Sequence, residues 1–228
     1  MFSITDYFLN INKLKNKMYE NLNAEEVIKI VLLGESGVGK TNLINVSMGK
    51  EFQQNSDSSL SSSFVSSDYK VGNKVYTYVL WDTAGQESYR SLNKIFIKNT
   101  KVVIFVYSIE NYKSFQELDY WVNIAKEELG DNSIYAIIGN KSDLYDEQEV
   151  KDEEAEKYAK EHNMKIKFTS ALADAKGVKS YLNELISDYI KTIEPEYIGE
   201  NVEKKKEKTS NVKLVPIPKP KKEKKKWC

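Results

Sequence analysis

The clearest chemical signature in the sequence is a glycine-rich stretch, GESGVGKT, at residues 34–41. Glycines at this spacing let successive backbone N–H groups converge on a phosphate, and a helix that opens at the end of the stretch adds partial positive charge. The alternative is a glycine-rich turn with an incidental lysine. We expect a strand before the stretch and a helix after it, and a phosphate-binding loop requires both whereas a simple turn requires neither. The predicted phosphate-binding residues are Gly34, Glu35, Ser36, Gly37, Val38, Gly39, Lys40 and Thr41.

Within this stretch two side chains would act on a nucleoside triphosphate and its metal. Lys40 would reach the β- and γ-phosphates, and the hydroxyl of Thr41 would bind Mg²⁺. A second motif, WDTAGQE at residues 81–87, follows a predicted strand. There Asp82 would hold the metal, usually through water, and the N–H of Gly85 could donate to the γ-phosphate. The two motifs indicate a nucleoside triphosphatase or kinase, and the base is still open.

Two later motifs, GNKSD at 139–143 and TSAL at 169–172, indicate the base. Asp143 can accept two hydrogen bonds from guanine, whereas adenine would leave that carboxylate unpaired, and discrimination of this kind reaches factors of about 10⁴. Asn140 would brace the loop, Lys141 would lie along the base, and the N–H of Ala171 would be available to guanine O6. An N-K-x-D match alone also occurs in polar turns, but its place after the phosphate motifs favours a guanine site. The predicted guanine-binding residues of these motifs are Asn140, Lys141, Asp143, Ser170, Ala171 and Leu172.

The elements that must position these motifs are strands and helices in alternation between residues 27 and 193. Apolar runs predict strands at 27–34, 74–81, 101–108, 133–140 and 165–170, and residues 62–71 are a weaker candidate for an edge strand. Helical patterns occupy 40–48, 88–98, 114–129, 152–162 and 178–193. This alternation is typical of an α/β fold with a mostly parallel sheet and helices on both faces. Ligands of such sheets bind at the carboxyl ends of the strands, where the motifs lie.

Composition limits the class of protein. A chain of 228 residues with 40% apolar content can bury one main core and carry tails. No apolar run is long enough to span a bilayer, and no signal-peptide pattern begins the chain, so we expect a protein that is neither secreted nor transmembrane. The single cysteine, Cys228, excludes an internal disulfide and a Cys-based zinc site, which fits a reducing, cytosolic setting.

Two extensions, residues 1–26 and 194–228, flank the predicted domain of residues 27–193. In the first, apolar residues recur every three or four positions, which predicts an amphipathic helix. It either packs on the domain's own surface or binds a partner or a membrane. In the second, residues 204–228 carry eleven lysines and two glutamates, a charge of +9 against −9 for the rest of the chain. This tail has no apolar periodicity, so we predict that it is disordered.

With these motifs in this order, the chain resembles a small GTPase of the Ras superfamily over about residues 27–193, and within it the Rab family. The segments that carry the resemblance are LLGESGVGKTNL, WDTAGQESYRSL, GNKSDL and TSALADAKGV. The resemblance implies a three-layer P-loop GTPase domain with a six-stranded, mostly parallel sheet, and Mg²⁺ with GTP or GDP as ligands. It also implies a monomeric switch that hydrolyses GTP slowly and recruits effectors in vesicle trafficking, with no nucleic acid as partner.

The resemblance assigns roles to residues outside the short motifs. In Rab proteins the switch threonine that binds Mg²⁺ lies nineteen residues after the P-loop lysine, which here is Ser59, inside a serine-rich stretch. Gln86 matches the glutamine that orients the attacking water, and Phe52 matches the aromatic residue beside guanine. Ser61 replaces the glycine that follows the switch threonine in Rab proteins. The alternative is therefore a GTP-locked adaptor that hydrolyses poorly, and Gln86 argues against it.

The resemblance also marks two binding surfaces. Phe64, Trp81 and Phe96 match the hydrophobic effector patch of Rab proteins, although three core aromatics would give the same pattern. Cys228 is a candidate site of prenylation, although Rab tails usually end in two cysteines. The nearby lysines could bind an anionic leaflet. The expected partners are an exchange factor, a GTPase-activating protein, an escort protein or GDP dissociation inhibitor, and effectors. The expected location is the cytoplasmic face of intracellular membranes, in exchange with the cytosol.

Overall fold

The computed structural model describes residues 27–54, 63–82 and 96–195, which form a six-stranded sheet in the order β2-β3-β1-β4-β5-β6. The strands are β1 (Ile28–Leu33), β2 (Ser63–Val71), β3 (Lys74–Asp82), β4 (Val102–Ser108), β5 (Ile134–Asn140) and β6 (Lys165–Phe168). β2 pairs antiparallel with β3, and the other neighbours pair in parallel. The predicted α/β fold with a mostly parallel sheet is confirmed, and the weakly predicted edge strand is β2.

Five α-helices and one 3₁₀ helix are described. They are α2 (Lys40–Ser47), α4 (Tyr112–Gln116), α5 (Leu118–Leu129), the 3₁₀ helix η2 (Tyr145–Glu147), α6 (Asp152–Glu161) and α7 (Ala175–Ile193). The single helix predicted at 114–129 is two helices, because the backbone at Glu117 (φ −70°, ψ −7°) leaves regular α-helical values. Most of the helix predicted at 88–98 lies outside the described residues. Among the helices described, none combines the length and the apolar character needed to cross a bilayer.

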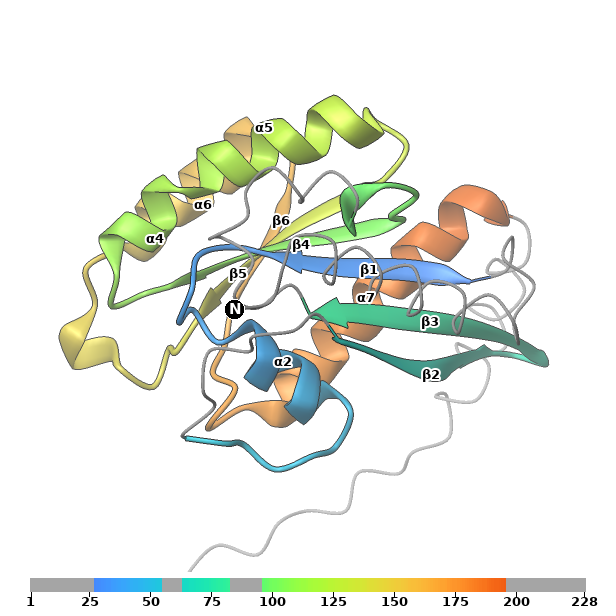
Figure 1. Cartoon of the computed structure of the whole chain (residues 1–228), viewed down its shortest axis with the longest axis horizontal. Coiled ribbons are helices and arrows are strands. Elements are labelled where there is room, and N and C mark those ends of the chain that lie inside the picture. The colour runs from blue at the N-terminus through green and yellow to red at the C-terminus, as the bar shows by residue number, and fades with distance from the viewer. Residues whose placement is uncertain (1–26, 55–62, 83–95, 196–228) are drawn as a thin grey trace, which may run out of the picture.

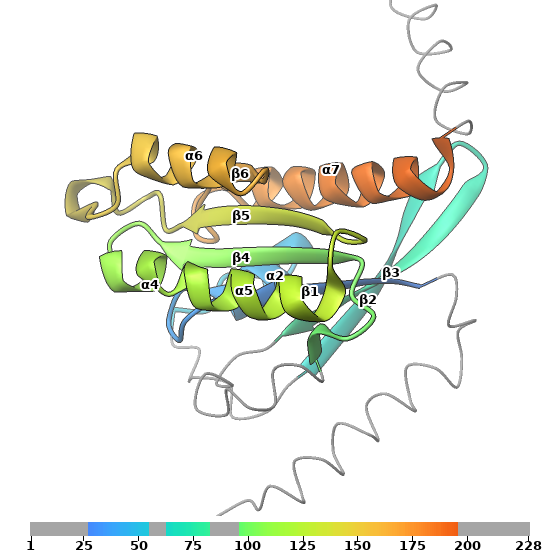
Figure 2. The same ribbon diagram turned by 90° about the horizontal axis from the view of Figure 1, so that it is seen from above.

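The strands carry apolar side chains on both faces, and each face is covered by helices (Figure 1). On one face, side chains such as Val31 and Phe105 join a core with α5 and α6. On the other face, their neighbours Leu32 and Ile104 join a core with α2 and α7. Figure 2 shows from above how α4 and α5 run along β4. Parallel strands buried on both faces require this three-layer arrangement.

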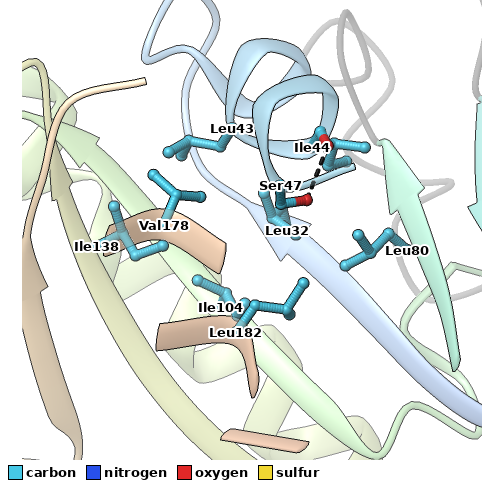
Figure 3. Close-up of a pocket in the computed structure, with 9 residues that line it drawn as sticks. All are labelled: Leu32, Leu43, Ile44, Ser47, Leu80, Ile104, Ile138, Val178 and Leu182. Atoms are coloured by element: carbon cyan, nitrogen blue, oxygen red, sulfur yellow. Dashed lines mark hydrogen bonds between the residues drawn. The ribbon is translucent and has the colours of Figure 1, made fainter. Parts of the chain in front are cut away.

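A small apolar cavity of about 20 Å³ lies between α2, α7 and the sheet (Figure 3). The hydroxyl of Ser47, its one polar lining side chain, donates to the carbonyl of Ile44 at 2.8 Å. The space holds about one water molecule, and the apolar lining offers that water few partners. We therefore regard this cavity as a packing gap and not as a ligand site. Its lining residues are Leu32, Leu43, Ile44, Ser47, Leu80, Ile104, Ile138, Val178 and Leu182.

The functional edge of the sheet is set by strand direction. Because β1, β3, β4 and β5 run parallel, their carboxyl ends meet at one edge. The register places Leu33 opposite Phe105 and Ser108 opposite Asn140. The glycine-rich loop follows Leu33, and Asp82 is the last residue of β3. The predicted phosphate and base motifs are thus brought to the same edge, where ligands of open parallel sheets bind.

Candidate functional site

The loop between β1 and α2 depends on glycine at two positions. Gly34 has φ 153°, and a Cβ there would collide with the carbonyl of Val106 on β4. Gly39, the N-cap of α2, has φ 94°, and a Cβ there would collide with the side-chain amide of Asn140. Both positions combine a backbone conformation that favours glycine with a close approach. The loop is therefore packed against both β4 and the end of β5.

Lys40 lies under this loop. Its side chain is buried, and Nζ donates to the carbonyl oxygens of Gly34 and Glu35 at 2.7 Å each. The positive charge is thereby held beside the N-terminus of α2. A loop of backbone N–H groups, a helix N-terminus and a buried cation together form an arrangement suited to phosphate.

A candidate metal-binding pair lies next to this loop. The hydroxyl of Thr41 donates to Oδ2 of Asp82 at 2.9 Å, and Asp82 is buried. Mg²⁺ prefers oxygen ligands and is commonly held by one or two carboxylates together with the phosphates of its substrate. Among the described residues, no group of three His, Cys, Asp or Glu side chains could hold a metal ion. Thr41 and Asp82 therefore fit a Mg²⁺ ion that completes its coordination with phosphate and water.

At the base end, Asn140 connects two loops that lie far apart in the sequence. It is buried; Nδ2 donates to the carbonyl of Val38 at 2.7 Å, and Oδ1 accepts from the N–H of Ala171 at 3.2 Å. These two hydrogen bonds are how Asn140 could carry out the bracing role that we predicted for it. The sequence led us to expect a free Ala171 N–H for guanine O6, but that N–H already has an acceptor in Asn140. Guanine would have to share or replace this hydrogen bond.

The turn that contains Lys141 and Asp143 is held by its backbone. Lys141 has φ 63°, a left-handed conformation that is uncommon for a residue with a side chain. Its carbonyl accepts from the N–H of Leu144 at 2.9 Å, and the N–H of Ser142 donates to Thr169 at 3.1 Å. Asp143 lies in this turn and is partly exposed. The turn therefore presents its two charged side chains from a fixed backbone.

The TSAL loop is shaped by Ser170. Its buried hydroxyl accepts from the N–H groups of Leu172 at 3.1 Å and Ala173 at 2.9 Å. Leu172 itself is exposed. The three residues predicted beside guanine here, Ser170, Ala171 and Leu172, thus form one tight turn next to Asn140.

One partner of the base motif was not singled out from the sequence. The ammonium of Lys141 pairs with Oε1 of Glu110 at 2.6 Å. Glu110 lies two residues after β4 ends at Ser108, and Ser108 pairs in register with Asn140. The only signal available beforehand was an acidic residue just after a strand. The role of Glu110 can be recognised only when the pairing of β4 with β5 is known.

Comparison with known sequences decides the family. The sequence profile of the Ras family matches residues 29–191. The chain belongs to the Ras family of small GTPases. It is similar to the Ras-related protein Rab-11B of Dictyostelium discoideum, with 34% identity over 168 residues that cover 74% of this chain and 76% of that protein. This Ras-family protein is therefore a GTP-hydrolysing small GTPase that is most similar to Rab proteins.

Several predicted residues of this GTPase lie outside the described residues. These are Ser59, Gly85, Gln86 and Cys228, together with the amphipathic helix predicted within residues 1–26. Their roles stay predictions. Phe52, predicted beside guanine, is described: its side chain is partly exposed and packs against the core that α2 and α7 form with the sheet. The next residue, Gln53, is tied to α2 by two hydrogen bonds with Asn42, at 3.0 and 3.1 Å.

The three aromatic rings predicted as an effector patch do meet. The ring centroids of Phe64 and Trp81 are 5.4 Å apart, and those of Trp81 and Phe96 are 6.1 Å apart. Trp81 and Phe96 are each only 1% exposed, whereas Phe64 is partly exposed. In this GTPase the rings of Trp81 and Phe96 are thus part of the core, and of the three only Phe64 reaches the surface.

A buried lysine supports these rings. Lys29, on β1, donates from Nζ to the carbonyl oxygens of Phe96 at 2.5 Å and Lys98 at 2.8 Å. The same ammonium lies 5.3 Å from the ring centroid of Trp81. A single lysine in the otherwise apolar strand IKIVLL was the available sequence signal. We infer that Lys29 holds the segment after residue 95 against β1 and β3.

Proposed function

We propose that this small GTPase is a Rab-like switch that binds GTP and GDP with Mg²⁺ and recruits effector proteins in a membrane-trafficking step. The observation that supports this most strongly is the role of Asn140, which joins the phosphate loop at Val38 to the TSAL loop at Ala171. One amide thereby couples the phosphate end of the site to the base end. A site built in this way suits a nucleotide that spans both.

At the phosphate end, the loop N–H groups and Lys40 bind the phosphates. Thr41 and Asp82 would hold Mg²⁺, which would neutralise phosphate charge, and Ser59 would join them in the GTP state. Gln86 orients the water that attacks the γ-phosphate. Loss of that phosphate would remove the acceptor of the Gly85 N–H, and Ser59 would no longer bind Mg²⁺. The two switch segments then report which nucleotide is bound.

At the base end, Asp143 selects guanine, because its carboxylate accepts from both donors of the guanine edge. We expect GTP and GDP to bind far more tightly than ATP. Asp143→Asn should shift the preference towards xanthine nucleotides, since the new amide can donate to the C2 carbonyl of xanthine. Asp146→Asn, at an exposed position in η2, is the matched control and should leave selectivity unchanged. Equal affinity of the unaltered protein for ATP and GTP would refute the guanine site.

For the membrane, we propose that Cys228 carries a lipid and that the tail lysines supply a second, electrostatic attraction to the cytoplasmic face of an intracellular membrane. One lipid chain alone gives marginal attachment, and each lysine near an anionic leaflet contributes about 1 kcal/mol. Cys228→Ser should move the protein to the cytosol, and neutralising Lys221, Lys222, Lys224, Lys225 and Lys226 should weaken or redirect binding. Mass spectrometry that finds an unmodified C-terminus in cells would exclude the anchor.

A further inference from the structure

We propose that Glu110 is a positioning residue for Lys141 and thereby sets how long the guanine nucleotide stays bound. This inference rests on the proposed guanine site. It adds a residue that belongs to neither the N-K-x-D motif nor the TSAL motif.

The place of Glu110 is determined by the pairing of β4 with β5. Ser108 lies opposite Asn140, and the N–H of Ile109 donates to the carbonyl of Asn140 at 3.1 Å. The chain after β4 is therefore tied to the first residue of the base motif. Glu110, one residue further on, comes to lie beside Lys141.

The ion pair compensates two partly buried charges. Nζ of Lys141 and Oε1 of Glu110 are 2.6 Å apart, and the two side chains are 32% and 20% exposed. The second carboxylate oxygen of Glu110, Oε2, is buried and has no hydrogen-bond partner in the described part of the chain. A buried acceptor without a donor is unfavourable. The ammonium of Lys141 is therefore the group that stabilises Glu110 here, and Glu110 in turn fixes the ammonium.

This contact holds the lysine stem at both ends. The backbone of Lys141 is fixed at φ 63° by the hydrogen bond from Leu144, and the ammonium is fixed by Glu110. Lysine side chains lose much rotamer freedom when they become ordered. A stem that is already ordered can cover the base without that loss, which favours the bound state. Removing the Glu110 charge should loosen the stem and speed nucleotide release.

The test is the dissociation rate of a fluorescent GDP analogue from the full chain, with unlabelled GDP in excess. Glu110→Gln should accelerate release about three- to tenfold, because the lysine stem would then lose part of its rotamer freedom again each time it covers the base. Glu110→Asp, which keeps the charge, should release more slowly than Glu110→Gln. The matched control is Glu184→Gln. Glu184 pairs with Lys165 at 2.5 Å at the opposite, amino end of β6, so its loss should leave the rate unchanged.

A double-variant cycle separates positioning from a general structural role. Lys141→Met keeps the apolar stem without the ammonium, so Glu110→Gln should cause no further acceleration in that background. Equal acceleration in both backgrounds would mean that Glu110 acts through the fold, and it would overturn the proposal. So would a Glu110→Gln rate equal to or slower than that of the unaltered protein. Failure of the unaltered protein to retain GDP is a different result, since it would refute the guanine site itself.

Discussion

The hydroxyl of Thr41 donates to a carboxylate oxygen of Asp82 at 2.9 Å, which joins the first turn of α2 to the last residue of β3. These residues are 41 positions apart in the sequence, and the two elements meet only because β1 and β3 are neighbours in the sheet. The pair offers oxygen ligands beside the phosphate loop. It is the part of the described structure that most clearly suits Mg²⁺.

Thr41→Ala should therefore weaken Mg²⁺ binding by about 10- to 100-fold. This is the range typical of losing a group that hydrogen-bonds to a metal ligand, as Thr41 does to Asp82. GDP release from the variant should be fast at Mg²⁺ concentrations that slow release from the unaltered protein, and a chelator should add little. The measurement is GDP dissociation across a Mg²⁺ titration. Thr77→Ala is the matched control, because Thr77 also donates to an aspartate, Asp68, at 2.9 Å, but on the β2–β3 hairpin. Equal Mg²⁺ dependence of the two variants would contradict the assignment.

Two substitutions of Ser59 should change the stability of the triphosphate state in opposite directions. If Ser59 binds Mg²⁺ only in the triphosphate state, Ser59→Thr adds a methyl group that restricts the rotamer and should stabilise that state by about 0.5–1 kcal/mol. Ser59→Ala removes the hydroxyl and should destabilise it. Dissociation of a non-hydrolysable GTP analogue should slow in the first variant and accelerate in the second, while GDP dissociation changes little in both. If neither variant alters release of the GTP analogue, Ser59 is not the switch ligand.

The packing of α7 on the sheet can be tested with two isoleucines of the same helix. Ile186 is fully buried, and Ile193 is 49% exposed. Ile186→Ala should lower the free energy of unfolding by about 2–5 kcal/mol, because it removes a core side chain and leaves a cavity. Ile193→Ala should change it by no more than about 0.5 kcal/mol. Urea unfolding of the GDP-loaded protein measures both, and similar losses would contradict the observed face of α7.

Glu194, just after α7, leads to a pH prediction. Hydrogen bonds from Lys74 and Tyr76 hold the pKa of Glu194 below its ordinary value of 4.5. A carboxylate with a lowered pKa contributes stability above its unfolded pKa and loses it as the pH falls through the folded pKa. The melting temperature of Glu194→Gln should therefore fall less steeply below pH 4.5 than that of the unaltered protein. Glu128→Gln, at an exposed position in α5, should keep the original slope.

The sequence predicted the elements well because their signals are local. Glycines at 34 and 39 and the apolar runs of the strands report backbone conformation and burial directly. The edge strand at residues 62–71 was predicted more weakly than the other strands, because serines interrupt its apolar pattern. Pairing with β3 along nine residues nevertheless holds β2 in place.

What the sequence could not provide was contact between distant segments. The bond from Asn140 to Val38 spans 102 positions, and the Glu110–Lys141 pair depends on the register of β4 and β5. The sequence also could not show which of the aromatic residues are buried. Trp81 has the same identity whether it faces an effector or the core, and only the folded structure shows that it is buried in the core beside Phe96.

Single-turnover hydrolysis of GTP bound to the full chain, measured beside Gln86→Leu, tests whether this GTPase works as a switch. We expect the unaltered protein to hydrolyse GTP at a rate on the order of 10⁻⁴ to 10⁻³ per second, because the water-orienting glutamine is present and an arginine supplied by a partner is not. Gln86→Leu should be clearly slower, with GTP affinity nearly unchanged, since the residue acts on the water and not on the bound ligand. If the unaltered protein is as slow as Gln86→Leu, the protein is a GTP-locked adaptor and not a cycling switch.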